Sequence, residues 1–157
     1  MEIYKISKHK YSGQLTASGH AGRWNYKGQE VIYTASSRAL ASLEVMVHLS
    51  GIRLSSDVFK ITVIHVPADV HINHVPVEDI QPGWGGLSSY SMTQPLGSSW
   101  IRSRESCVLR VPSSIIQHEF NFLINPNHEE IGKLVVVDVE DFLYDPRLLE
   151  KFKPHAI

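Results

Sequence analysis

The side chains best suited to chemistry lie in three separate segments of the sequence. These are residues 19–28 (GHAGRWNYKG), 33–44 (YTASSRALASLE) and 111–126 (VPSSIIQHEFNFLINP). The familiar single-segment motifs are absent: there is no GxxxxGKS/T phosphate loop, no GxGxxG between a strand and a helix, no HExxH and no cysteine pair for zinc. Any chemistry therefore depends on a fold that brings the three segments together.

The first segment has the composition of an anion-binding loop. Arg23 lies between Gly22 and Trp24, with Gly19 and Gly28 on either side. Glycine lets a backbone approach a ligand closely, and a guanidinium binds phosphate through paired hydrogen bonds. The alternative is a surface turn in which Arg23 stacks on Trp24. The residues alone leave both interpretations open.

The second segment places a carboxylate at the edge of an apolar helix face. At about 100° per residue, Glu44 stands about 60° from Val47 and about 40° from Leu40, so it borders the apolar stripe. Burying such a carboxylate unpaired is costly, so it must reach water, a cationic partner or a ligand. The competing interpretation is a boundary glutamate whose flexible stem carries its charge to water.

Tyr33 and Ser113 each have a structural interpretation beside a functional one. Tyr33 lies in the middle of a predicted strand and is either a core aromatic or a platform for stacking. Ser113 follows the strand-ending Pro112, where serine commonly serves as a turn or cap residue. Neither His48 nor His118 has a second metal-binding group at ligand spacing, so we expect no metal site.

An early strand and helix are expected to position the first two segments. Residues 30–35 (EVIYTA) have strong strand preference, and the two serines that follow can cap a helix starting at Arg38. The apolar residues that recur at helical spacing are Leu40, Leu43 and Val47. The helix is predicted to stop at Ser50 and Gly51, where glycine supplies a left-handed cap.

Strands dominate the rest of the chain. They are expected at residues 58–66, 107–111, 119–124 and 133–139. Residues 81–99, rich in Gly, Ser and Pro, are predicted to form a long loop, followed by a helix from residue 100 that places Trp100 in the core. A short helix is expected at residues 146–151. The predicted class is α+β, a compact mixed or antiparallel sheet with flanking helices.

Length and composition restrict the class of protein. The 157 residues are 43% hydrophobic and 20% charged, which is typical of one folded domain over residues 1–157 and excludes wholesale disorder. The net charge of −1 gives no basic surplus for nonspecific nucleic-acid binding. No apolar run is long enough for a membrane span. The single cysteine, Cys107, and a start without an apolar stretch favour the cytoplasm.

Taken together and in order, the segments resemble a known family. The stretches GHAGRWNYKGQEVIYTASSRALASLEVMVHL, VLRVPSSIIQHEFNFLINPNH and KLVVVDVEDFLYDPRL closely resemble the RES-domain family, toxins of bacterial toxin–antitoxin modules. The family takes its name from a dispersed arginine, glutamate and serine. These match Arg23, Glu44 and, by its place after a strand-ending proline, Ser113; Ser114 is the alternative serine. The contiguous RES tripeptide at residues 104–106 is a coincidence.

The resemblance implies a fold similar to ADP-ribosyltransferase toxins, with a cleft that binds NAD+. NAD+ would be consumed as a substrate, by hydrolysis or phosphorolysis, rather than recycled as a cofactor, and growth arrest would follow. The implied partner is a helix-turn-helix antitoxin that blocks the cleft in a hetero-oligomer. By the same resemblance Glu44, Arg23 and Ser113 would be catalytic. The residues expected to contact the substrate are Arg23, Tyr33, Ser113 and Asn121.

The residue chemistry is compatible with cleavage of the nicotinamide–ribose bond. The cationic ring leaves as neutral nicotinamide, so no acid is needed to protonate it and one carboxylate can suffice, whereas ordinary glycoside hydrolysis uses two. Two other functions stay open at this point. One is a protein ADP-ribosyltransferase with the same cleft and residues. The other is a noncatalytic regulatory module in which Arg23, Glu44 and Ser113 only maintain structure.

Overall fold

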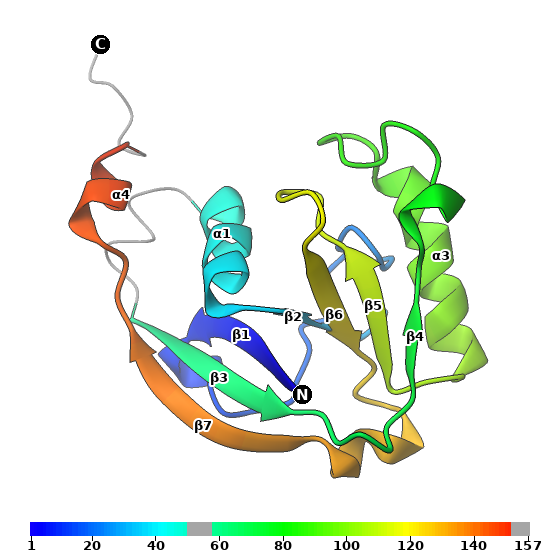
Figure 1. Ribbon diagram of the computed structural model, residues 1–157, viewed down its shortest axis with the longest axis horizontal. Helices are drawn as coiled ribbons and strands as arrows, with labels where there is room; N and C mark the ends of the chain where they lie inside the picture. The colour runs from blue at the N-terminus through cyan, green and yellow to red at the C-terminus, as the bar shows by residue number, and fades with distance from the viewer. Residues whose placement is uncertain (50–57, 152–157) are drawn as a thin grey trace.

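The computed structural model describes residues 1–49 and 58–151, which form a seven-stranded sheet flanked by helices (Figure 1). The strand order is β4-β5-β6-β2-β1-β3-β7. The strands are β1 (Glu2–Lys8), β2 (Ile32–Ala35), β3 (Phe59–His65), β4 (Ile72–His74), β5 (Val108–Pro112), β6 (Phe120–Ile124) and β7 (Val135–Phe142). The β4–β5 pair is parallel and the other neighbouring strands are antiparallel. The predicted α+β class with a mixed sheet is therefore confirmed.

Three α-helices and three short 3-10 helices accompany the sheet in the part of the chain that the structure describes. They are α1 (Arg38–His48), α3 (Tyr90–Ser103), α4 (Pro146–Lys151), η1 (His9–Tyr11), η2 (Val77–Asp79) and η3 (Glu129–Lys133). The first helix begins as predicted, because the hydroxyl of Ser37 accepts the N–H of Leu40 at 3.1 Å and caps it. Its predicted end at Ser50 and Gly51 lies outside the described residues. No helix in residues 1–49 and 58–151 is long and apolar enough to cross a membrane.

Helices α1 and α3 lie on the same face of the sheet, on either side of β5 and β6 (Figure 1). Ala35 of β2 belongs to the same buried cluster as Leu40 of α1, whereas Leu123 of β6 shares a second cluster with Trp100 of α3. In the β2–β6 ladder Ala35 pairs with Asn121, two residues from Leu123. Since alternate residues of a strand share a face, Asn121 lies on the helix-bearing face, between the two clusters.

The opposite face of the sheet carries another core cluster. Its strand residues are Ile3, Ile32, Ile64, Val108, Phe122 and Ile124. Burial on both faces explains why β1 was not predicted. Ile3 belongs to this cluster and Ile6 to the α1 cluster, so the strand shows no period-two alternation of apolar and polar residues. The three-residue strand β4 was also missed, because it is too short to produce a pattern.

The predicted loop at residues 81–99 is wrong in its second half. Helix α3 starts at Tyr90 and runs to Ser103, so only residues 81–89 of the predicted loop lie outside a helix. Gly, Ser and Pro favour a loop in isolation, but here the small Gly97 and Ser98 are buried where the helix packs closely on other backbone. Trp100 is 6% exposed, which agrees with its predicted place in the core.

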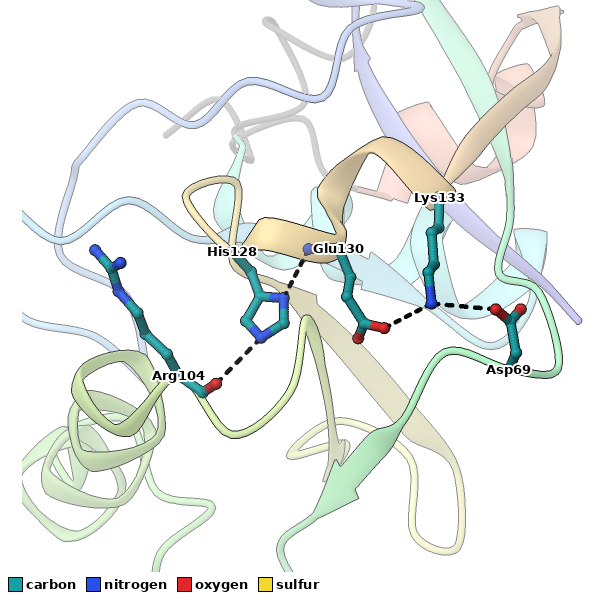
Figure 2. A network of polar contacts seen from close by, with 5 residues as sticks. All are labelled: Asp69, Arg104, His128, Glu130 and Lys133. Carbon is teal, nitrogen blue, oxygen red and sulfur yellow. Dashed lines mark hydrogen bonds and ion pairs between the residues drawn. The ribbon is translucent and has the colours of Figure 1, made fainter.

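A polar network ties the end of α3 to η3 and to the β3–β4 connection (Figure 2). Nδ1 of His128 accepts the N–H of Glu130 at 3.1 Å, so the ring proton lies on Nε2, which donates to the carbonyl of Arg104 at 3.1 Å. Lys133 bridges Glu130 and Asp69 at 2.8 and 3.1 Å, and its hydrogen bond lowers the pKa of Asp69. Because Arg104 is the C-cap of α3, the network fixes the end of that helix farthest from Tyr90.

Strand β7 forms an edge of the sheet with its outer side uncovered in Figure 1. Its valines at 135, 137 and 139 are between 37% and 50% exposed, which is a liability for strand pairing between molecules. The Oδ1 of Asp138 accepts the N–H of Val139 at 2.7 Å, so a side chain already occupies this edge donor. The register shift at Val63 and Ile64 adds a local irregularity in the β3–β7 pairing.

We expect Asp138→Ala to increase self-association, because it frees the Val139 N–H and removes a charge from the edge. Size-exclusion chromatography with light scattering over a concentration series measures the effect. Asp141→Ala is the matched control, since it removes the same charge from the same strand without freeing an edge N–H; Asp141 pairs with Lys60 instead. Equal behaviour of the two variants would show that the capped N–H has no role.

Candidate active site

Glu44, Ser113 and Asn121 meet between α1 and the ends of β5 and β6. Nδ2 of Asn121 donates to Oε1 of Glu44 at 2.6 Å, and Oγ of Ser113 donates to the same oxygen at 3.4 Å. A carboxylate only accepts hydrogen bonds, so the Asn121 amide must direct its nitrogen toward Glu44. One carboxylate oxygen is thus held by two donors. No residue in the described ranges donates to Oε2, which leaves that oxygen available to a ligand.

The turn after β5 determines the direction of the Ser113 hydroxyl. Oγ of Ser113 accepts the N–H groups of Ile115 and Ile116 at 3.1 and 3.2 Å, the cap geometry expected of serine after a strand. With both lone pairs engaged, its proton is left for Glu44. Ser113 is 6% exposed, and its hydroxyl both caps this turn and contacts Glu44. Of the two candidate serines, Ser113 is the one whose hydroxyl reaches Glu44.

Asn121 has a second polar atom that the fold leaves unpaired. Its Oδ1 is buried without a hydrogen-bond partner, and the residue is 9% exposed. An unsatisfied buried acceptor costs about 1–3 kcal/mol, so a donor is expected to complete it. Together with Oε2 of Glu44, this atom makes the α1 end of the site rich in acceptors and poor in donors. Such a surrounding suits hydroxyl groups and positive charge.

Tyr33 binds the arginine-bearing loop through its hydroxyl and is also within electrostatic reach of Glu44. Its hydroxyl accepts the N–H of Trp24 at 3.0 Å and donates to Oδ1 of Asn25 at 2.7 Å. Loss of hydration raises the pKa of Tyr33, so the hydroxyl keeps the proton that it donates to Asn25. The residue is nevertheless 37% exposed. Because the hydroxyl is satisfied internally, Tyr33 offers a ligand its ring rather than a hydrogen bond.

Arg23 belongs to the loop that binds the Tyr33 hydroxyl, and its guanidinium contacts residues 84–86. Its Nη1 donates to the carbonyl of Trp84 at 2.6 Å and its Nη2 to that of Gly86 at 3.2 Å. The guanidinium carbon stands 4.7 Å from the centre of the Tyr90 ring. The predicted alternative of stacking on Trp24 is therefore not what the structure has, because Arg23 stacks on Tyr90. Trp24 is 2% exposed and packs against Trp84 instead.

The loop that carries Arg23 is held by buried amides and by α3. Asn25 is 1% exposed, and its Nδ2 donates to three carbonyls of the same loop, those of His20, Tyr26 and Gln29. Nε2 of Gln94 donates to the carbonyls of Gly22 and Asn25, on either side of Arg23. Thr93 donates to the carbonyl of Arg23 itself. The backbone at Arg23 is thus held both by Asn25 within its own loop and by Thr93 and Gln94 of α3.

The five predicted site residues fall into two groups. Glu44, Ser113 and Asn121 are joined by hydrogen bonds, and Arg23 belongs to the loop beside Tyr33. Glu44 and Arg23 both act on Tyr33 electrostatically, the first raising its pKa and the second lowering it, although desolvation is the larger cause. Tyr33 therefore lies within the field of both groups.

Sequence reasoning missed three residues that hold the site together: Asn25, Tyr90 and Gln94. The position of Asn25 could have indicated a role, because it lies two residues after Arg23 in the most distinctive segment of the sequence. Tyr90 and Gln94 had none, because they fell within a region predicted to be a loop. Their partners lie about seventy residues away in the chain, at a separation of 72 for Gln94 and Gly22.

One surface pocket of the described residues lies away from this site. It encloses about 270 Å³ between β4, η2 and α3. Among its lining residues are His74, Asp79, Leu96, Trp100 and Glu105. None of the predicted site residues lines it. Within residues 1–49 and 58–151, no group of three His, Cys, Asp or Glu side chains is arranged to hold a metal ion.

Comparison with known proteins identifies the family. The model of the RES domain matches residues 2–145. A Prs ADP-ribosylating toxin of Sphingobium sp. is 36% identical over 83% of this chain and 81% of its own length. A protein named Toxin Res from Yersinia enterocolitica is 33% identical over 94% of this chain and 99% of its own. The chain belongs to the RES-domain family.

A solved structure has the same fold. The crystal structure of the M. tuberculosis MbcT–MbcA toxin–antitoxin complex contains a chain that superposes with a TM-score of 0.75, covering 97% of this chain and 88% of that one. Sequence identity in the superposition is 15%, so the likeness concerns the fold alone.

Proposed function

We propose that the protein is the toxin of a toxin–antitoxin module and cleaves the nicotinamide–ribose bond of NAD+. Family membership and relatives named as toxins support the first part. The arrangement of side chains around Tyr33 supports the second. The substrate is consumed, and loss of NAD+ arrests growth.

One observation carries this proposal: the site has opposite electrical character at its two ends. At the α1 end Glu44 is held through Oε1 by Asn121 and Ser113, and Oε2 has no donor among residues 1–49 and 58–151. At the other end Arg23 supplies a guanidinium. NAD+ has the matching polarity, because its cationic nicotinamide and ribose hydroxyls lie at one end of an anionic diphosphate.

The chemistry requires little from the protein beyond electrostatics and orientation. The bond between ribose C1′ and the nicotinamide nitrogen breaks, and its electron pair leaves with the ring, which becomes neutral. Positive charge develops on the ribose, where the Glu44 carboxylate stabilises it. Water or phosphate then attacks C1′; water loses one proton, and the products are ADP-ribose, nicotinamide and H+. Ser113 and Asn121 keep Glu44 in place, and the Tyr33 ring flanks the nicotinamide ribose.

An antitoxin partner follows from the same proposal. The solved structure with this fold is a toxin–antitoxin complex, and two further relatives, from Photorhabdus laumondii and Pseudomonas putida, are named Toxin Res. We propose that a helix-turn-helix antitoxin covers the Glu44 site in a hetero-oligomer. Nucleic-acid contact then belongs to the antitoxin, in agreement with a net charge of −1 on this chain.

A second candidate function is transfer of ADP-ribose to a protein. It is favoured by the Sphingobium relative, which is named a Prs ADP-ribosylating toxin and is 36% identical. The same bond of NAD+ breaks in both reactions, and the same residues serve. Only the nucleophile differs, since a side chain of the target replaces water or phosphate.

Purified protein incubated with NAD+ alone distinguishes these functions. We expect nicotinamide release without any protein target, measured by liquid chromatography, with ADP-ribose as the second product. A phosphorylated ADP-ribose that forms only when phosphate is added identifies phosphorolysis. An NAD+ pool that stays intact until a bacterial lysate is added, with label then appearing on a protein band, would contradict degradation and establish transfer. No turnover in either arm would support the noncatalytic module.

A further inference from the structure

The guanidinium of Arg23 is held by three groups that belong to one short segment. Two are the carbonyls of Trp84 and Gly86, at 2.6 and 3.2 Å, and the third is the ring of Tyr90, at 4.7 Å from the guanidinium carbon. An arginine has five N–H donors, and the two carbonyls engage one N–H on each of two nitrogens. Three donors have no partner among the residues that the structure describes and are available to a ligand.

The segment that holds Arg23 is itself ordered by side chains of α3 and its start. Oγ of Ser89 lies 2.6 Å from both carbonyls that Arg23 contacts. The Ser89 hydroxyl therefore stabilises the turn at 84–89 that presents these carbonyls to the arginine. Tyr90 is the first residue of α3 and Thr93, one turn later, donates to the carbonyl of Arg23. The ring of Tyr90 therefore belongs to the same helix that binds the backbone of Arg23 through Thr93.

We propose that Tyr90 is a positioning residue: with the Trp84 and Gly86 carbonyls it fixes Arg23 so that the remaining donors meet the diphosphate of the substrate. The diphosphate as ligand rests on the proposed function. An arginine side chain loses much rotamer freedom when it is immobilised on a ligand, and the ring and carbonyls immobilise it before the ligand arrives. Stacking on an aromatic face leaves the edge of the guanidinium, where the N–H groups are, open to an anion.

The sequence offers a matched pair of variants at this position. Tyr90→Phe keeps the ring over Arg23 and removes only the hydroxyl, whereas Tyr90→Leu removes the ring and keeps an apolar side chain. A cation–π contact of about 0.5–2 kcal/mol predicts that Tyr90→Leu raises the KM for NAD+ about two- to thirty-fold, with kcat changed much less. Tyr90→Phe is expected to stay within about two-fold of wild type in both constants.

Direct binding gives a readout that does not depend on turnover. The Kd for ADP-ribose and for inorganic pyrophosphate, measured by calorimetry, is expected to rise by the same factor in Tyr90→Leu and to stay near the wild-type value in Tyr90→Phe. Thermal melting confirms that each variant is folded. Tyr90→Met replaces Tyr90→Leu in every measurement if the leucine variant is unfolded, because methionine fills the site flexibly without a ring.

The results separate this inference from the proposed function. If wild type binds pyrophosphate but releases no nicotinamide, the proposed reaction is wrong while the positioning role is still tested by the Kd series. If Tyr90→Leu binds as tightly as wild type, or Tyr90→Phe binds as weakly as Tyr90→Leu, the ring does not position Arg23 and the inference is overturned. It is also overturned if wild type binds neither ADP-ribose nor pyrophosphate.

Discussion

Glu44→Gln is expected to reduce nicotinamide release from NAD+ by about a hundred- to a thousand-fold, the usual loss when one preorganised electrostatic group is removed from a catalytic site. Glutamine is isosteric, and its Oε1 can still accept from Asn121 and Ser113, which donate to Oε1 of Glu44 in the structure. The amide nitrogen then occupies the place of Oε2. A donor replaces an acceptor where positive charge develops, so the fold is kept and the chemistry is lost.

Glu119→Gln is the matched control for this variant. Glu119 is an exposed carboxylate on the same β5–β6 connection as Ser113, and its oxygen accepts from Ser36 at 3.2 Å rather than from the Glu44 group. The Glu119→Gln substitution removes the same charge from the same end of the molecule, and we expect this variant to turn over NAD+ at the wild-type rate. Turnover by Glu44→Gln within about ten-fold of wild type would remove Glu44 from the reaction.

Growth provides an independent measurement of the same variant. Wild type expressed in bacteria is expected to deplete NAD+ and stop growth. Cells that express Glu44→Gln at the same soluble level are expected to keep their NAD+ and to continue growing. A variant as toxic as wild type would mean that toxicity does not come from this carboxylate. If neither protein were toxic, the noncatalytic module would be favoured.

The sequence predicted the elements whose signals are local. The serine cap and the apolar residues at helical spacing predicted α1, and the β-branched runs predicted β2, β3, β5, β6 and β7 to within a few residues. The helix α3 was predicted only from residue 100 onward. Its first ten residues contain Pro95 and Gly97, and the reason for a small residue at 97 is a close contact with Trp24, far away in the chain.

The sequence singled out Glu44, Ser113 and Asn121, which the structure joins by hydrogen bonds, but it did not predict these contacts. The geometry of an amphipathic helix placed Glu44 at the border of the apolar stripe, and the structure gives it partners there. These partners, Ser113 and Asn121, are separated from it by 69 and 77 residues, so only the sheet register brings them together. The partners of Arg23 lie 61 and 63 residues away. No pattern within one segment can encode such a pairing.

Gly97→Ala is expected to destabilise the protein strongly, even though alanine favours a helix by about 0.8–1.0 kcal/mol over glycine. A Cβ at Gly97 would stand 1.9 Å from the carbonyl oxygen of Trp24 and 2.8 Å from its carbonyl carbon. Both are backbone atoms, which cannot rotate away as a flexible side chain would. Either α3 or the Arg23 loop must shift, and overpacking of this kind costs about 1–3 kcal/mol.

Thermal unfolding measures this loss, at about 2–4 °C for each kcal/mol in a chain of this size. Gly132→Ala is the matched control, because a Cβ there has nothing within 4 Å, so its melting temperature is expected to stay near that of wild type. The strain also reaches the site, since Trp24 adjoins Arg23 and its N–H binds the hydroxyl of Tyr33. Gly97→Ala should therefore lose nicotinamide release at temperatures where it is still folded. A stable, fully active Gly97→Ala would mean that the Arg23 loop can shift away from the added Cβ at little cost in free energy, and that the position of this loop does not matter for catalysis.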